Sequence, residues 1–295
     1  MSDQPRNGET VLPWFPIRNN EAKTILTKTS GFIATAGFTH SLTPARNCTY
    51  GCTYCYVPTL RVYGGLKRED WRRWGQFTTI KSNAAELLRR ETRREQVIYC
   101  SPLVDPYQPA EGTAQVMPPI LEALIDKPPA VFVIQTRGPL VLRDLKQLIE
   151  LNRCTVLRVS FSLTTDLEEV RRLYEPHCEP LSQRLSVMRS LRQAGIAVYA
   201  TLAPLLPCDP ENLAARALEA TDRDIIGDPL HERSMKPHGA TTREAALRIS
   251  SAHGYEAWHE PSFQHRVAER VHAVVQAAGR CFSTGPEAFA WLSER

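Results

Sequence analysis

Short runs of β-branched and aromatic residues alternate along this chain with stretches whose apolar residues recur every three or four positions. Residues 130–135, which read Ala-Val-Phe-Val-Ile-Gln, are typical of a buried strand. A later stretch has Leu181, Leu185 and Met188 at helical spacing. Strands are expected at residues 32–43, 96–103, 130–135, 155–163, 196–202 and 224–226. Helices are expected at residues 79–94, 116–125, 140–151, 167–173, 181–194, 210–220 and 264–278.

Strands that alternate with helices predict a parallel sheet with right-handed crossovers. The expected strand–helix units are too few for the eight-stranded barrel of this class. The expected fold class is therefore α/β, a partial (β/α)6 barrel open along one side. We expect an N-terminal extension over residues 1–30, the barrel over 31–228, and a C-terminal helical extension over 229–295 that covers the barrel. All three would form one structural unit, and the loops after the strands would meet at one face.

The composition is that of a soluble protein. Hydrophobic residues make up 42% of the 295 residues, and no apolar run approaches the roughly 20 residues that cross a bilayer. The polar N-terminus lacks the apolar stretch of a signal peptide. We therefore expect a cytoplasmic protein without a membrane partner, whose eight cysteines stay reduced. The net charge of +4 neither demands nor excludes a nucleic-acid partner, and the oligomeric state is not indicated.

Three of the cysteines lie in one short segment directly after the first expected strand. Cys48, Cys52 and Cys55 have the spacing C-x3-C-x2-C. Thiolates hold iron–sulfur clusters, which normally take four of them, so a cluster with three would leave one iron for a small molecule. The alternative is a zinc site completed by His40 or a distant cysteine. Zinc cysteines usually come as C-x2-C with a matching second pair, and that pair is absent here.

This motif, with the aromatic Tyr54 before its third cysteine, resembles the signature of the radical S-adenosylmethionine (SAM) superfamily. Over about residues 32–207 the chain is similar to the spore photoproduct lyase branch of that superfamily. The segments that carry this similarity are Tyr54-Cys55-Tyr56, residues 105–111 (Asp-Pro-Tyr-Gln-Pro-Ala-Glu), Phe161-Ser162-Leu163, Tyr174-Glu175-Pro176 with Arg184, and residues 203–207 (Ala-Pro-Leu-Leu-Pro). The cysteine triplet is specific to the superfamily, and the other segments together indicate the branch.

The resemblance implies a [4Fe–4S] cluster held by Cys48, Cys52 and Cys55, with SAM on the open iron. An external one-electron reductant of the flavodoxin or ferredoxin type would supply the electron. SAM would then be cleaved to a 5′-deoxyadenosyl radical that abstracts hydrogen from a substrate, with the cofactor supplying this chemistry. The substrate would be damaged DNA with a thymine lesion, or else a small metabolite or peptide.

The resemblance also assigns residues to SAM. Arg137 would pair with its carboxylate, since a guanidinium suits that group, although a solvated arginine is the alternative. Ser162 would meet the ribose or carboxylate, unless it is an ordinary strand serine. Asp105 and Glu111 would orient the SAM amino group or the substrate. Arg184 is assigned to cofactor binding by the same resemblance.

Three residues are assigned to radical chemistry. Spore photoproduct lyase has a cysteine at the end of its second strand that donates a hydrogen atom, and Cys100 lies near the matching place. Its distance along the chain to Asp105 is about two residues too long, and a buried strand cysteine is the alternative. Tyr54 and Tyr56 match tyrosines that flank the third cluster cysteine, where they would relay a radical or pack beside SAM.

A protein of another class remains as an alternative. Basic residues alternate with Trp71 and Trp74 between positions 61 and 74, as in surfaces that hold a phosphate backbone and stack a base. With zinc at the cysteine motif, the chain would be a zinc-binding nucleic-acid-binding protein. The basic residues of 79–94 are better explained as a solvated helix face balanced by glutamates.

Overall fold

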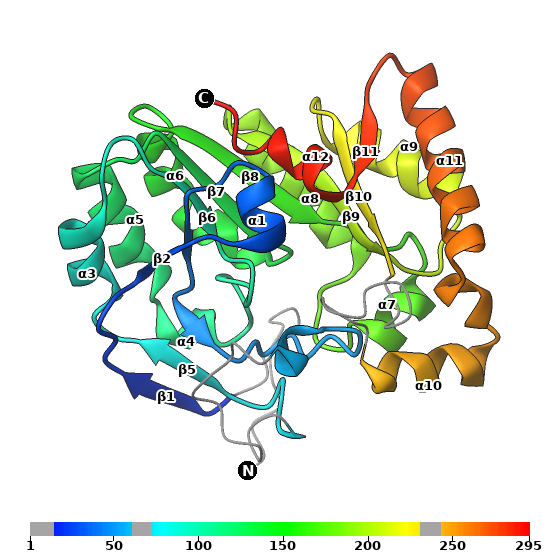
Figure 1. Cartoon of the computed structure of the whole chain (residues 1–295), viewed down its shortest axis with the longest axis horizontal. Coiled ribbons are helices and arrows are strands. Elements are labelled where there is room, and N and C mark those ends of the chain that lie inside the picture. Colours follow the sequence, from blue (N-terminus) through cyan, green and yellow to red (C-terminus); the bar gives the residue numbers. More distant parts are fainter. Residues whose placement is uncertain (1–14, 61–71, 231–242) are drawn as a thin grey trace, which may run out of the picture.

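An eight-stranded sheet lies at the centre of the computed structural model, which describes residues 15–60, 72–230 and 243–295 (Figure 1). The strands lie in the order β11-β10-β9-β8-β7-β6-β3-β2, and all neighbours pair in parallel except β2 with β3. The strands are β2 Leu26–Lys28, β3 His40–Leu42, β6 Val97–Cys100, β7 Val131–Thr136, β8 Val156–Ser162, β9 Ala197–Leu205, β10 Ile225–Pro229 and β11 Phe282–Thr284. The expected partial barrel is confirmed, with β3, β6, β7, β8, β9 and β10 as its six parallel strands.

Helices cover the outer face of this sheet, and two more helices lie on its inner face (Figure 1). The outer helices are α3 Ala84–Glu91, α5 Met117–Asp126, α6 Leu145–Leu151, α8 Leu181–Gln193, α9 Pro210–Ala220 and α11 Pro261–Ala277. The inner helices are α1 Gly31–Thr35 and α12 Gly285–Ala290. The remaining helices are η1 Val57–Thr59, α4 Glu111–Ala114, η2 Pro139–Asp144, α7 Glu168–Tyr174, α10 Glu244–His253 and η3 Glu256–His259.

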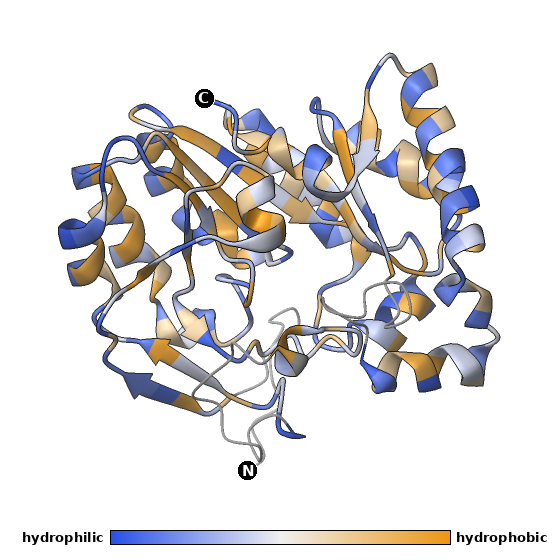
Figure 2. Ribbon diagram, viewed as in Figure 1, coloured by the Kyte–Doolittle hydropathy of each residue, from blue (hydrophilic) through white to orange (hydrophobic). Residues whose placement is uncertain are grey.

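Alternation along each strand separates two apolar cores. Ile98 and Phe132 pack with the outer helices, whereas Val97 and Val131 pack with α1 and α12 on the inner face. Both faces of the central strands are therefore hydrophobic, and the outer helices turn their apolar sides to the sheet (Figure 2). None of the described helices has the length and apolar character needed to cross a membrane.

Three expected segments differ from the structure. Residues 32–43 form helix α1 and the short strand β3 rather than one strand, with a break at Gly37, whose φ is +87°. The β-branched start of 79–94 belongs to strand β5 Thr78–Lys81 instead of a helix. Strand β5 forms a second sheet with β1 Ile17–Asn20 and β4 Ala45–Arg46. The C-terminal segment does more than cover the barrel, because β11 extends the central sheet beside β10.

Candidate functional site

The cysteine motif forms a loop after β3 and β4, where it is pinned to neighbouring segments. Gln108 Oε1, from the loop after β6, accepts hydrogen bonds from Thr49 N (2.7 Å) and Thr49 Oγ1 (3.1 Å). The Asn47 side chain accepts from Gly75 N at 3.0 Å. Gly75 has φ +90°, and a Cβ on it would lie 2.7 Å from the Cα of Gly51, so this close contact requires glycine. The loop geometry is thus set by contacts far apart in sequence.

The three thiols of the motif lie in surroundings that suit sulfur ligands. Burial raises the pKa of Cys48, and so does the nearby Asp105, but the backbone N–H groups of Asp105 and Tyr50 favour its thiolate. Burial also raises the pKa of Cys55 to about 12, against the backbone N–H of Val57. At Cys48 and Cys55, nearby backbone N–H groups therefore oppose the effect of burial on the pKa. Such donors are the usual partners of sulfur bound to iron.

Cys52 has the strongest donor set of the three. Cys178 is the main cause that lowers the pKa of Cys52, in opposition to burial, and Arg137 lowers it further. The Arg137 Nη1 atom lies 3.6 Å from the Cys52 Sγ atom. Donors to all three motif cysteines mean that the residues present fit a [4Fe–4S] cluster held by Cys48, Cys52 and Cys55.

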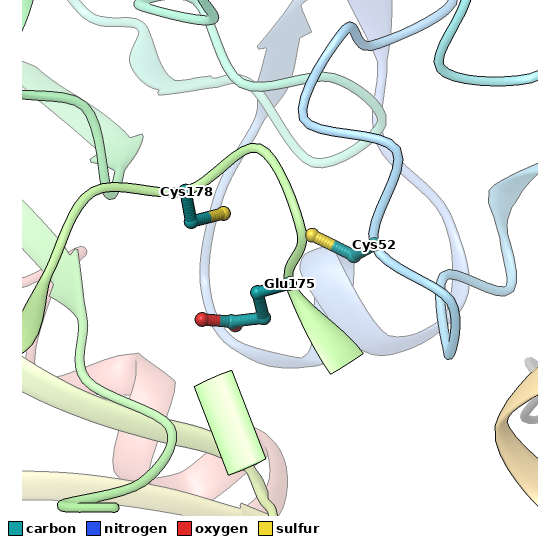
Figure 3. A group of neighbouring side chains, drawn as sticks. All are labelled: Cys52, Glu175 and Cys178. Atoms are coloured by element: carbon teal, nitrogen blue, oxygen red, sulfur yellow. The ribbon is translucent and has the colours of Figure 1, made fainter. Parts of the chain in front are cut away.

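A mononuclear zinc site fits less well. Zinc–sulfur bonds of about 2.3 Å would bring tetrahedral ligand atoms to within about 4 Å of one another. Within the described part of the chain, the group whose ligand atoms all lie within 4.8 Å is Cys52, Glu175 and Cys178 (Figure 3). It contains neither Cys48 nor Cys55. His40, which the zinc alternative offered as a fourth ligand beside a distant cysteine, is also outside this group, and its Nδ1 shares a hydrogen bond with the Thr39 side chain.

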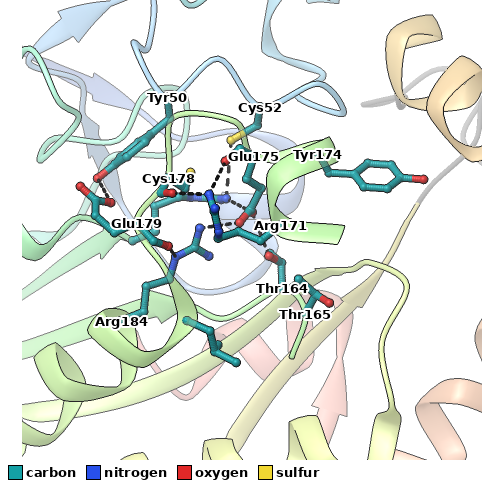
Figure 4. Close-up of polar contacts among 12 residues, drawn as sticks. Tyr50, Cys52, Thr164, Thr165, Arg171, Tyr174, Glu175, Cys178, Glu179 and Arg184 are labelled. Carbon is teal, nitrogen blue, oxygen red and sulfur yellow. Dashed lines mark hydrogen bonds and ion pairs between the residues drawn. The ribbon is translucent and has the colours of Figure 1, made fainter. Parts of the chain in front are cut away.

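Glu175, which directly follows α7, lies beside Cys52, Cys178 and Arg184 (Figure 4). Its Oε1 atom accepts hydrogen bonds from Tyr54 Oη (2.6 Å), Thr164 Oγ1 (2.8 Å) and Arg137 Nη1, and Oε2 accepts from Arg184 Nη2 (2.5 Å). Burial alone would raise the pKa of Glu175, but Arg184 and Arg137 hold it at about 2. Glu175 is therefore an ionised carboxylate whose two oxygens are already occupied, which does not suit a metal ligand.

Arg137 and Asp105 lie together at the cysteine loop, as the sequence predicts. The Arg137 backbone N–H donates to Asp105 Oδ2 at 2.8 Å, while Asp105 Oδ1 accepts from Thr136 Oγ1 at 2.6 Å. These bonds join the end of β7 to the loop after β6. The Arg137 side chain then reaches Cys52, Tyr54 and Glu175. The Asp105 carboxylate thus binds the last residue of β7 and the residue that follows it, and acts on the site through Arg137.

Arg184 has an indirect place in the site. Its side chain is 2% exposed and bonds to Glu175 Oε2 and to the carbonyl of Glu179 (3.2 Å). Arg184 is thus connected to the cysteine loop through Glu175 and Arg137, and its assignment to cofactor binding stays a prediction. Arg184 therefore positions Glu175, which in turn positions Arg137.

Ser162 is the last residue of β8, and its side chain lies on the inner face of the sheet. Near the carboxyl ends of β7 and β8, the residues on this face are polar. Gln135 Nε2 donates to Ser162 Oγ at 2.9 Å, and Gln135 Oε1 accepts from Tyr99 Oη (2.6 Å) and Ser160 Oγ (2.7 Å). Ser160 also shares a hydrogen bond of 2.6 Å with Thr201. Sequence reasoning missed this network. The signal was the recurrence of polar residues at inward-facing positions near the carboxyl ends of three adjacent strands.

Two assigned residues do not join the site. Both carboxylate oxygens of Glu111 are occupied, by the backbone N–H groups of Val116 (3.1 Å) and Met117 (2.9 Å) and by Arg143 Nη2 (2.9 Å). Glu111 thus caps the start of α5, and no free oxygen supports its assignment to SAM or substrate. Cys100 is 0% exposed and packs in the core under the outer helices. Strand alternation directs Tyr99 to the inner face and Cys100 to the outer face, and the assignment of Cys100 as a hydrogen donor stays a prediction.

The two tyrosines around Cys55 lie differently. Tyr54 is buried and donates to Glu175, and its ring lies 5.9 Å from the Arg137 guanidinium carbon. Tyr56 is 36% exposed. Tyr54 therefore belongs to the hydrogen-bond network under the loop, and Tyr56 is the more accessible to a bound molecule. Their assignment to a radical relay stays a prediction.

Residues 42–215 match the family model of the Radical SAM superfamily. This match covers more than half of the chain, so the chain belongs to that superfamily. Its members use a [4Fe–4S] cluster and SAM. The family therefore accounts for the cysteine loop and for the donors around its sulfurs.

Several uncharacterized proteins are similar to this chain in sequence. An uncharacterized protein of Mycobacterium tuberculosis is 29% identical over 177 residues, which are 58% of this chain and 50% of that protein. The chain thus spans about half the length of the mycobacterial relatives it matches. An uncharacterized protein of Acidianus two-tailed virus is 28% identical over 208 residues, 65% of this chain and 67% of that protein.

Structures of spore photoproduct lyase are among the solved structures that resemble this chain. A single mutant of that lyase matches with a TM-score of 0.58 at 13% identity, over 95% of this chain and 88% of the lyase. A double mutant with bound AdoMet and dinucleoside spore photoproduct matches with a TM-score of 0.60 at 13% identity, over 96% of this chain and 87% of the lyase. At these identities the likeness shows a shared fold.

Proposed function

We propose that this chain is a radical SAM enzyme that cleaves SAM reductively and uses the resulting radical to take hydrogen from a substrate. The observation that carries the proposal is the loop with Cys48, Cys52 and Cys55, which Gln108 and Asn47 hold in place and in which Arg137 Nη1 lies 3.6 Å from the Cys52 sulfur. Cys48, Cys52 and Cys55 would hold the cluster, which would supply the one-electron reduction that cleaves SAM. The electron comes from an external reductant of the flavodoxin or ferredoxin type.

Arg137 has the right arrangement to hold the SAM carboxylate. In the described part of the chain, the hydrogen bonds of its side chain all come from Nη1. The Nη2 end of the guanidinium is therefore available to donate to a carboxylate. The ion pair with Glu175 fixes the orientation of the Arg137 guanidinium and neutralises its positive charge before SAM binds. Binding and orientation of SAM are the tasks of these two residues.

Ser162 has a donor to spare for the same ligand. Its oxygen already accepts from Gln135 Nε2, so its own hydroxyl proton is directed elsewhere. We assign that proton to the ribose or carboxylate of SAM. Gln135 then holds the serine in place, and its two further bonds to Tyr99 and Ser160 fix the amide.

The test is anaerobic reconstitution with iron and sulfide, reduction with dithionite and analysis for 5′-deoxyadenosine from SAM. The wild-type chain should form it, and Cys52→Ala should not. The exposed Cys281 offers a matched control, because Cys281→Ala removes a thiol outside the motif and should leave the product unchanged. Protein that holds zinc but no acid-labile sulfide would instead support the zinc-binding nucleic-acid-binding protein.

The first substrate class to test is damaged DNA with a thymine lesion. Support comes from the shared fold with spore photoproduct lyase, whose structures include a dinucleoside spore photoproduct. The lesion would have to leave the duplex, at a cost of a few kcal/mol. DNA binding should then weaken steeply as salt rises. A negligible salt slope would remove DNA as the substrate. The basic residues with Trp71 and Trp74, which suggested a nucleic-acid surface, lie mostly outside the described residues.

The orientation of Cys100 favours a second candidate, a small metabolite or peptide. A lyase-type repair needs a thiol that can reach the product radical, and Cys100 faces the outer helices. A substrate whose radical needs no quenching thiol would avoid this requirement. The two candidates separate on DNA binding and on whether Cys100→Ala alters the final product.

A further inference from the structure

A fourth thiol lies at the cysteine loop, from a segment outside the motif. Cys178 Sγ is within 4.8 Å of Cys52 Sγ, and Figure 3 shows the two sulfur atoms facing each other. Cys178 is 5% exposed, so little water competes for its thiol. It lies in the connection between α7 and α8.

Backbone contacts fix the position of this thiol. The Cys178 N–H donates to the Glu175 carbonyl at 3.0 Å, and the Cys178 carbonyl accepts from Arg171 Nη1 at 2.6 Å. The same connection docks on the cysteine loop, since Thr53 N donates to the Tyr174 carbonyl at 2.9 Å. The approach of Cys178 to Cys52 is therefore built into the backbone on both sides.

The group of Cys52, Glu175 and Cys178 does not suit a separate metal ion. Both oxygens of Glu175 already accept hydrogen bonds from arginine side chains. The guanidinium groups of Arg137 and Arg184 would also repel a dication placed between them. What remains for Cys178 is its S–H, a weak hydrogen-bond donor, with the sulfur of Cys52 in front of it.

We propose that Cys178 is a positioning residue for the cluster, which donates a hydrogen bond to the Cys52 sulfur and so raises the reduction potential of the cluster. The inference rests on the proposed function. Reduction adds negative charge to the cluster and its thiolates, and donors to ligand sulfur stabilise that charge. Arg137 Nη1, 3.6 Å from the same sulfur, acts in the same direction. Together they make the cluster easier for an external reductant to reduce.

The test is the midpoint potential of the reconstituted full chain without SAM, from a redox titration followed by electron paramagnetic resonance. Cys178→Ala removes the donor and should shift the potential to a more negative value. Cys178→Ser keeps an O–H donor and should stay closer to wild type. Cys154→Ala removes a thiol that bonds only to carbonyls of its own helix end, and should leave the potential unchanged.

Resonance Raman spectra give a second readout. Loss of a hydrogen bond to a ligand sulfur strengthens the iron–sulfur bond, so the Fe–S(Cys) stretching bands should move to higher frequency in Cys178→Ala. If that variant does not retain its cluster, Cys178→Val removes the donor with a larger side chain and should show both shifts.

Equal potentials for wild type, Cys178→Ala and Cys178→Val would overturn the inference. So would a shift in Cys178→Ser as large as that in Cys178→Ala, because the donor would then not be the cause. A wild-type chain that forms no cluster would overturn the proposed function itself. The two failures are thus distinguishable, since the first requires a wild-type cluster with a measurable potential.

Discussion

Two buried glutamates, Glu175 and Glu111, each bind an arginine near the carboxyl edge of the sheet, yet only one belongs to the site. Arg184 and Arg137 hold the pKa of Glu175 at about 2 against the effect of burial. At Glu111 the effect of burial is the larger one and raises the pKa, although Arg143 and two backbone N–H groups act to lower it. Glu175 thus stays charged and directs a guanidinium at Cys52, whereas Glu111 satisfies the first turn of α5.

A buried ion pair therefore contributes to function only if it positions groups that belong to the site. Both glutamates were visible in the sequence segments that resemble the lyase branch, and residue type did not separate them. The groups bound to each carboxylate do separate them. Glu175 binds a tyrosine and two arginines beside the cysteine loop, whereas Glu111 binds backbone N–H groups at the start of a helix. Four measurements would break or sharpen this comparison.

The largest effect is expected from Glu175→Ala. Removal of the carboxylate leaves Arg137 and Arg184 buried without their anion, and breaking such a pair costs about 3–5 kcal/mol of unfolding free energy. Guanidinium unfolding under anaerobic conditions measures this loss. The variant should also bind SAM more weakly, because Arg137 is no longer oriented. Unaltered stability and SAM affinity would contradict the role of Glu175 in positioning Arg137.

The pH dependence of stability should follow from the same carboxylate. A folded pKa of about 2 against an ordinary value of 4.5 corresponds to roughly 3 kcal/mol. Because the folded pKa is lowered, this stability is present above pH 4.5 and is lost as the pH falls toward 2. The unfolding free energy should therefore drop less between pH 5 and pH 3 in Glu175→Gln than in wild type. Equal drops would contradict the pairing.

A smaller effect is expected from Glu111→Ala. Two backbone N–H groups of α5 lose their acceptor, which costs about 1–3 kcal/mol, while Arg143 keeps Asp144 at 2.7 Å. SAM affinity and cleavage should stay at the wild-type level in the folded fraction. Isothermal titration with SAM, set beside the unfolding curve, checks both. A loss of SAM affinity without a loss of stability would return Glu111 to the site.

The smallest effect is expected from Cys100→Ala. The thiol is fully buried under the outer helices, so its removal should cost about 1 kcal/mol through the small cavity left behind. Yield of 5′-deoxyadenosine and identity of the final product should not change. Product analysis by mass spectrometry decides the point, since an altered product would show that the Cys100 thiol reaches the substrate after all.

The sequence predicted the sheet better than it predicted the site. Strand β7 has continuous apolar character over Val131 to Ile134, which identifies a buried parallel strand from local residues alone. Helix α1 was missed because its apolar residues pack on the inner face beside α12, a contact made with the far end of the chain. Strand β5 was missed because its pairing with β1 and β4 is a tertiary contact.

The candidate site was predictable where spacing alone defines it. Three thiols in one segment require no long-range information, and Arg137 follows its strand directly. Cys178 and Gln135 were not found, because their roles depend on how distant loops and inward-facing positions meet. The role of Cys100 stays a prediction: its side chain lies on the outer face of β6, and the sequence alone did not show which face the thiol would occupy.

The central claim is that one iron of a cluster at Cys48, Cys52 and Cys55 is left without a protein ligand and binds SAM. The most direct measurement is the electron paramagnetic resonance spectrum of the reduced, reconstituted chain before and after addition of SAM. We expect the signal of a reduced [4Fe–4S] cluster, with g-values that shift when SAM binds. A signal that SAM leaves unchanged, or protein that contains zinc and no cluster, would contradict it.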